Sequence, residues 1–235
     1  AYNAWLDHFK FKADPKSKAG EFLDVTVARL IDLCKAMLGQ ERDNNMSALA
    51  GRMVGLGQLE RAMLIAEAIG DPPLKAWKQI EVFQAMSKYA EAAKLCEELE
   101  KMPNAKLATT ALETRARLYK ERLARYADAI KLFNEINRPP WTAWMVVECY
   151  ESLAKPAEAV GILDEIENFF VQDAPRAAIH KAVVWNKAGD QKKAIAAAGG
   201  ITISGASPRT IPAPRSAPVA CTAARASRYP RPTPN

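Results

Sequence analysis

The sequence has few residues whose types and spacing could perform catalysis or bind a metal. Its two histidines, His8 and His180, are 172 residues apart, and neither belongs to a nucleophile or metal motif. Because His180 falls in a predicted helix, we expect it to have a surface or packing role. The four cysteines are 53 to 72 residues apart, which excludes C-x-x-C pairs, and no lysine-containing phosphate loop is present. We therefore predict a non-enzymatic protein without a metal or cofactor.

The distribution of charge argues against nucleic acid as the partner. The chain has 33 basic and 27 acidic residues and a net charge of +6, but residues 200–235 hold five arginines and no acid. Residues 1–199 therefore carry only +1, which is less than phosphate-backbone binding usually requires. The acidic runs 97–100 and 164–167 are typical of solvated helix faces rather than of acid-base pairs.

The sequence gives limited information about the compartment. No stretch of 18 apolar residues occurs, so no membrane-spanning helix is expected. Isolated cysteines suit a reducing compartment, and we therefore favour the cytoplasm. Because the chain begins with Ala1 rather than methionine, a removed leader and a periplasmic or exported location stay open as an alternative.

Five short segments share a pattern that would arrange side chains on repeated helices. Each begins with a small residue, ends five residues later in alanine, and precedes an apolar pattern of helical period. Their starts are 30, 37, 30 and 35 residues apart, and the segments are 57–62, 87–92, 124–129, 154–159 and 189–194. A bulky residue precedes each segment by four or five positions: Met53, Phe83, Tyr119, Tyr150 and Trp185. The pattern predicts helix, turn and helix in each repeat, with alanine where the helices approach closely.

Prolines separate the predicted helix pairs from one another. They occur at 72–73, 103, 139–140 and 175. Because proline lacks an amide donor and disfavours helix in the residue before it, these positions predict connections. Helix pairs that recur about every 34 residues form a solenoid, so the predicted fold is all-α.

In these segments a small residue, a turn, Tyr or Leu, and Ala are followed by proline, and this order resembles the tetratricopeptide repeat. The resemblance covers residues 44–199. It implies an all-α, right-handed superhelix of about five degenerate helix-turn-helix repeats.

The two ends of the chain differ from the repeats. We predict that residues 1–43 form an N-terminal helical pair or capping repeat, with Trp5 and Phe9 in its first helix and an apolar stripe from Phe22 to Met37 in its second. The polar run 40–45 is predicted to be a connection. Residues 200–235, rich in proline, arginine and alanine, are predicted to be a disordered tail or the product of a frameshift.

The resemblance also implies a binding groove, because the first helices of such repeats line the inner face of the solenoid. The side chains that it places there are Trp77, Glu81 and Gln84 in the second repeat, Arg117 and Lys120 in the third, Trp141, Trp144, Glu148 and Glu151 in the fourth, and Arg176, Val183 and Lys187 in the fifth. Aromatic anchors are typical of peptide grooves, whereas packing between repeats is the alternative role for each tryptophan. We predict a scaffold or adaptor that binds a peptide, a helix or a subunit of another protein.

Two alternatives stay open on the sequence alone. Residues 30–35 resemble part of the signature of pentatricopeptide RNA-binding repeats, although Glu81, Glu148 and Glu151 argue against a phosphate-lined groove. A solenoid with an uncapped end also tends to stack on another copy, so homo-oligomeric self-assembly is the second alternative.

Overall fold

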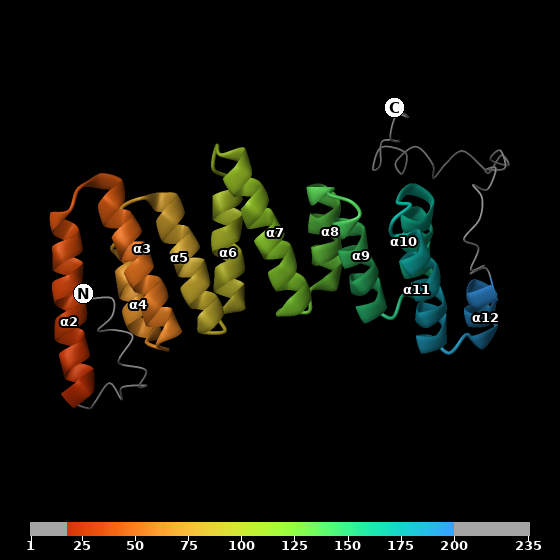
Figure 1. The fold of residues 1–235 in the computed structure, drawn as a ribbon, viewed down its shortest axis with the longest axis horizontal. Coiled ribbons are helices and arrows are strands. Elements are labelled where there is room, and N and C mark those ends of the chain that lie inside the picture. The colour runs from red at the N-terminus through yellow and green to blue at the C-terminus, as the bar shows by residue number, and fades with distance from the viewer. Residues whose placement is uncertain (1–17, 200–235) are drawn as a thin grey trace. The chain divides into compact units, whose positions relative to one another are not determined.

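The computed structural model describes residues 18–199, and this part of the chain forms eleven helices and is all-α, as predicted (Figure 1). The helices are α2 (Lys18–Ala36), α3 (Gly39–Gly55), α4 (Leu59–Glu67), α5 (Pro72–Ala85), α6 (Tyr89–Glu100), α7 (Ala105–Glu121), α8 (Tyr126–Ile136), α9 (Trp141–Ser152), α10 (Pro156–Phe169), α11 (Ala174–Lys187) and α12 (Gln191–Gly199). The predicted first N-terminal helix and the predicted tail lie outside the described residues. No helix within residues 18–199 is long and apolar enough to cross a membrane.

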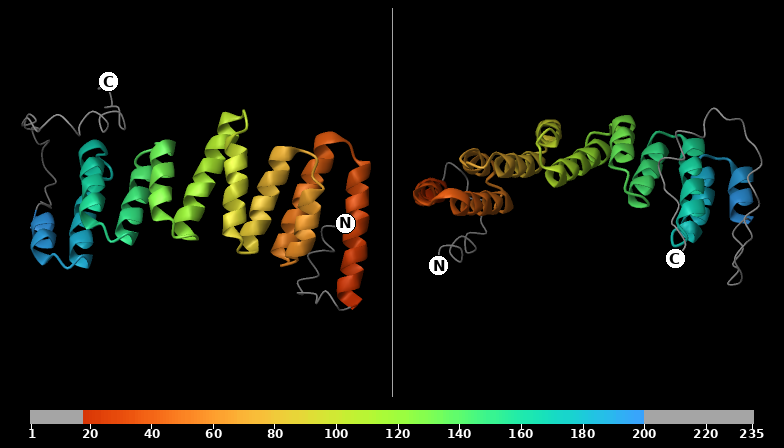
Figure 2. Two further views of the ribbon diagram at one scale, coloured as in Figure 1. Left: turned by 180° about the vertical axis from the view of Figure 1, so that it is seen from behind. Right: turned by 90° about the horizontal axis from the view of Figure 1, so that it is seen from above.

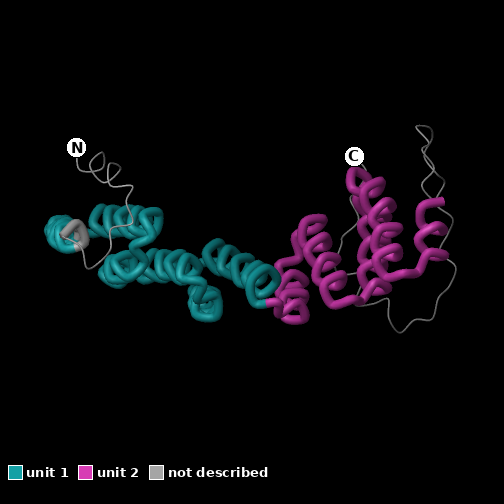
Figure 3. Tube along the Cα trace, turned by 90° about the horizontal axis from the view of Figure 1, so that it is seen from below, with its two compact units in different colours: residues 1–123 teal, residues 124–235 magenta. Residues whose placement is uncertain are grey.

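The helices belong to two compact units, residues 1–123 and residues 124–235 (Figure 3). In the first unit α3 packs on α2, α4 and α5, while α6 packs on α5 and α7. In the second unit each helix from α8 to α11 packs on the next one. Figure 2 shows these neighbours side by side in chain order within each unit. The boundary falls inside the predicted third repeat, whose first helix is α7 and whose second helix is α8.

The five turns within the repeats explain why each repeated segment begins with a small residue. That residue has a positive φ of 51° to 79° in every turn, at Gly57, Ser87, Ala124, Ala154 and Gly189. In four turns the amide of the next residue donates to the carbonyl of the bulky residue five positions earlier, at 2.8 to 3.0 Å: Met53, Phe83, Tyr150 and Trp185. This Schellman arrangement provides donors for the last carbonyls of the helix. A small side chain limits the steric cost of the left-handed backbone.

Replacing Ala154 with glycine is expected to stabilise the protein by about 1 kcal/mol, because glycine adopts a φ of 52° without a Cβ clash. Thermal unfolding followed by circular dichroism measures the change. The control is Ala157→Gly in the exposed first turn of α10, which should destabilise by up to about 1 kcal/mol. A loss of stability in both variants would contradict the role assigned to this turn.

The predicted breakers and close contacts are found at the expected places. Pro72 and Pro73 begin α5, Pro175 lies in the first turn of α11, and the prolines at 103 and 139–140 precede α7 and α9. The alanines that end the repeated segments are completely buried in four repeats: Ala62, Ala92, Ala129 and Ala159. Ala194 is only half-buried, because α12 packs on α11 and no described helix follows it.

The prediction that residues 40–45 form a connection is wrong, because they are part of α3. Polar residues can be part of this packed helix because Asp43 has buried partners: its side chain is only 7% exposed. Its carboxylate accepts hydrogen bonds from the backbone amides of Gly70 at 3.0 Å and Asp71 at 2.9 Å, and from Arg42 at 2.9 Å. Asp43 therefore provides acceptors for two backbone amides of the turn between α4 and α5. The predicted boundary between residues 43 and 44 falls inside α3.

The predicted helix that ends near Met37 is present as α2, but its apolar stripe is not one buried face. Val27 and Cys34 are buried in a core with α3 and α4, whereas Val25 and Leu33 are 52% and 54% exposed. Helix α2 thus has apolar side chains on its exposed side as well as on its buried side. The sequence did not predict this difference, because apolar positions alone do not state which face a neighbouring helix covers.

Candidate functional site

A hollow of about 610 Å³ lies along the first helices of the repeats in the first unit. Its lining residues come from α3, α5 and α7 and the position after α7: Ser47, Leu74, Trp77, Lys78, Ile80, Glu81, Gln84, Thr114, Arg117, Leu118, Glu121 and Arg122. Four of the predicted groove residues are brought together here, namely Trp77, Glu81, Gln84 and Arg117. Lys120 does not line the hollow.

Helical spacing explains why these side chains share one surface. On α5 the lining residues follow one another at intervals of one to three positions from Leu74 to Gln84, and on α7 they occupy 114, 117, 118 and 121. Residues three and four positions apart lie on the same side of an α-helix. On α3, Gly51 lies next to the ion pair of α5, because a Cβ at this position would be in van der Waals contact with Lys78 Nζ, at 3.4 Å. Helical period thus explains why the lining residues of each helix share one side, and the packing of the helices brings these sides together.

The hollow combines an apolar wall with charges of both signs. Trp77 is half-buried and packs against the core that contains Ile80 and Leu118. Lys78 is only 15% exposed and donates to Glu81 at 2.5 Å, so this cation is already compensated. The guanidinium of Arg122 lies over the ring of Tyr89, 5.4 Å from its centroid. The arrangement suits a ligand with apolar and mixed-charge groups.

The two predicted tryptophans of the second unit are packed between helices. Trp141 is half-buried and meets Phe133 of α8 edge to face, with 5.8 Å between ring centroids. Trp144 is 7% exposed, because the guanidinium of Arg176 lies 4.2 Å from its ring centroid and His180 lies edge to face at 5.7 Å. The expectation that Trp144 anchors a partner is therefore corrected, since Arg176 and His180 already cover its ring.

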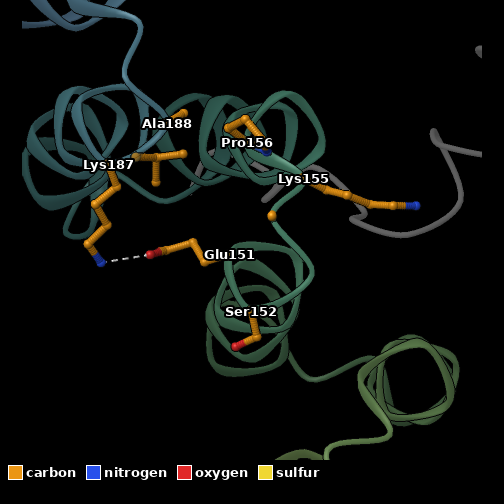
Figure 4. A pocket seen from close by; sticks show the side chains of 8 residues that line it. Glu151, Ser152, Lys155, Pro156, Lys187 and Ala188 are labelled. Atoms are coloured by element: carbon orange, nitrogen blue, oxygen red, sulfur yellow. Dashed lines mark hydrogen bonds and ion pairs between the residues drawn. The ribbon is translucent and has the colours of Figure 1, made fainter.

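A second hollow, of about 530 Å³, lies at the ends of α9 and α11 (Figure 4). It is lined by Glu151, Ser152, Ala154, Lys155, Pro156, Val184, Lys187 and Ala188. Figure 4 shows Lys187 reaching toward Glu151, and their Nζ and Oε2 atoms are 3.0 Å apart. The other carboxylate oxygen of Glu151 is 2.5 Å from Nε2 of His180. The remaining predicted residue, Glu148, is exposed one turn earlier on α9.

The interpretation of the sequence missed Lys78, which lines the first hollow, and His180, which contacts Glu151 of the second hollow without lining it. His180 lies at intervals of three and four from Arg176, Val183 and Lys187 on α11, the positions that the resemblance placed in the groove, so it shares their side of the helix. Lys78 is likewise adjacent to the predicted Trp77. Helical period could have identified these residues, whereas their partners depend on how separate helices pack.

Glu151 makes the second unit sensitive to acid. Burial raises the pKa of its carboxyl, but hydrogen bonds from His180 and Lys187 outweigh burial and hold the pKa below its ordinary value of 4.5. A pKa lowered by folding means that the ionised group stabilises the protein above pH 4.5. This contribution is lost as the pH falls through the pKa of the folded state.

Replacing Glu151 with glutamine is expected to cost about 1 kcal/mol at neutral pH, because two charge-assisted hydrogen bonds are weakened. Urea unfolding at pH 7 and below pH 4.5 measures this, and the difference between variant and wild type should shrink in acid. Glu158→Gln is the control, because Glu158 is half-exposed and lies 4.0 Å from Lys155. A difference that persists unchanged in acid would contradict the assignment.

The described residues contain little reactive chemistry. Between residues 18 and 199, no three His, Cys, Asp or Glu side chains are placed to hold a metal ion. Cys34, Cys96 and Cys149 are buried and do not form disulfides. Burial, with a contribution from Glu100, raises the pKa of the Cys96 thiol to about 12, which keeps it protonated at neutral pH.

No protein-family model matches the sequence, and no curated protein matches it. Among solved structures, the chain is similar to the crystal structure of BtubC (BKLC) from P. vanneervenii. The identity is 15% and the TM-score 0.42, and the match covers 86% of this chain and 100% of that chain.

Proposed function

We propose that the protein is a non-enzymatic, tetratricopeptide-like scaffold that binds a segment of another protein in the hollow of its first unit. The observation that carries this proposal is the origin of the lining residues, which come from the first helices α3, α5 and α7 and from Arg122 directly after α7. A peptide laid across three helices would contact all of them in turn. This mode of recognition follows from repeat architecture, because each repeat presents equivalent positions to one ligand.

The lining indicates the chemistry of the bound segment. Trp77, Leu74 and Leu118 offer apolar surface, on which an apolar side chain of the ligand would be buried. Arg117 and Glu121 lie one helical turn apart on α7 and would orient charged groups of opposite sign. We infer a segment with an apolar anchor and flanking charges of both signs.

The balance of charge supports a protein partner rather than RNA. Three basic side chains line the hollow, but Lys78 pairs with Glu81, and Glu121 is a second acid. A groove that follows a phosphate backbone needs an excess of cations. With three basic and two acidic side chains, the hollow has an excess of only one cation.

The test uses the full chain as an affinity bait and then measures the affinity of each captured partner for single variants. Trp77→Ala should lower the affinity for the partner by about tenfold or more, because an aromatic anchor is lost. Arg117→Glu should also lower the affinity for the partner, because it reverses the charge that orients the ligand. Trp185→Ala is the matched control, because this tryptophan is half-buried on α11, with Lys193 Nζ 4.2 Å from its ring centroid, and does not line the hollow.

Circular dichroism must first establish that each variant keeps the helical content of the wild type. A partner that binds all variants equally, or one weakened as much by Trp185→Ala as by Trp77→Ala, would refute the proposed site. Capture of RNA whose binding falls steeply with salt would instead favour the RNA-binding alternative.

A further inference from the structure

Arg122 accounts for the single excess cation of the hollow in the first unit. Lys78 pairs with Glu81, and these two charges compensate each other. Arg117 and Glu121 carry opposite charges and lie one helical turn apart on α7. Arg122 comes directly after α7 and is exposed. Among the residues that the structure describes, no carboxylate forms an ion pair with its guanidinium, which therefore remains without a counter-charge.

The ring of Tyr89 holds this guanidinium at the edge of the hollow. The central carbon of the guanidinium lies 5.4 Å from the ring centroid, which is within the range of a cation–π contact. Tyr89 begins α6, is half-buried and packs against the core that contains Ile80 and Leu118. Because a ring supplies no carboxylate oxygen, this contact positions the N–H donors of Arg122 without compensating their charge.

Trp77 and Arg122 lie toward opposite ends of the hollow along the helix axes. Helix α6 packs on both α5 and α7, so these two first helices run in the same direction (Figure 1). Trp77 lies ten residues before the left-handed residue of the turn after α5, Ser87. Arg122 lies only two residues before the equivalent residue, Ala124. This difference in position corresponds to about 12 Å along a helix axis.

We propose that Arg122, held by Tyr89, selects a bound segment that carries an Asp or Glu side chain at least about four positions from its apolar anchor. The minimum spacing follows from the axial distance, because an extended chain covers about 3.3 Å per residue. The carboxylate would accept two parallel N–H bonds from the guanidinium, a geometry that an ammonium group cannot offer. This inference rests on the proposed function, because Trp77 in the same hollow is the surface for the anchor.

The experiment selects a library of random linear peptides, displayed on phage, against the full chain and its variants. Peptides selected on the wild type should share an apolar residue and an acidic residue at the stated spacing. Arg122→Gln should abolish the enrichment of the acid and keep that of the apolar residue, whereas Trp77→Ala should abolish the latter. Arg29→Gln is the matched control, because Arg29 is exposed on α2 and does not line the hollow, so that it removes the same charge elsewhere.

Affinities of a selected peptide then test the pairing directly. Arg122→Gln should lower the affinity for this peptide by about fivefold or more, because a bidentate pair is lost. Replacing the acid of the peptide by its amide should cause the same loss, and combining both changes should add little. Arg122→Lys should restore only part of the affinity, since it returns the charge without the planar fork. Circular dichroism verifies that the variants keep their helices.

The outcomes separate this inference from the function on which it rests. Peptides that depend on Trp77 but show no enriched acid, or the same enrichment with Arg122→Gln, would overturn the role of Arg122 and leave the proposed function standing. An equal effect of Arg29→Gln would also overturn it, because overall charge would then explain the preference. If no selected peptide depends on Trp77, the proposed function is refuted, and this inference with it.

Discussion

Replacing Asp43 with alanine is expected to lower the free energy of unfolding by about 3 kcal/mol. The carboxylate is 7% exposed and is the acceptor for the amides of Gly70 and Asp71. Alanine would leave both amides and the Arg42 guanidinium without this partner. Gly70 belongs to the same arrangement, because a Cβ there would collide with Arg42. The substitution therefore disturbs the turn that joins α4 to α5, next to the helix that lines the hollow.

Asp71→Ala is the matched control for this prediction. Asp71 is exposed and caps α5 by accepting a hydrogen bond from the amide of Leu74 at 2.9 Å. Loss of such a cap costs about 1 kcal/mol. Urea unfolding of both variants measures the two costs, and equal losses would show that the buried carboxylate has no special role.

The second large effect is expected for Phe133→Ala in the second unit. Phe133 is completely buried, and truncation of a buried phenylalanine typically costs about 3–5 kcal/mol through lost burial and the remaining cavity. The variant also removes the ring that Trp141 meets edge to face. Trp141 should therefore become more mobile and more exposed.

Denaturant unfolding, together with tryptophan fluorescence, measures both consequences. Phe169→Ala is the control, because Phe169 ends α10 and is 41% exposed, so its loss should cost much less. If Phe133→Ala cost no more than Phe169→Ala, the packing role of Phe133 and Trp141 would be refuted.

Local properties of the chain determined the helix pairs. The left-handed turn favours small residues at Gly57 and Ala154, and the prolines within residues 18–199 lie in first turns of helices or in the connections before them. The resemblance to the tetratricopeptide repeat placed Trp77 and Arg117 in a groove, and both line the hollow. These features depend on a few consecutive residues, so the sequence alone predicts them.

Tertiary structure decided which of these side chains have partners and which are exposed. Asp43 is buried because the turn at 70–71 brings two amides to it, and Trp144 is covered because Arg176 and His180 come from another helix. Apolar period in α2 likewise did not distinguish its buried face from the exposed Val25. Each outcome depends on contacts between residues far apart in the chain, which periodicity and composition do not encode.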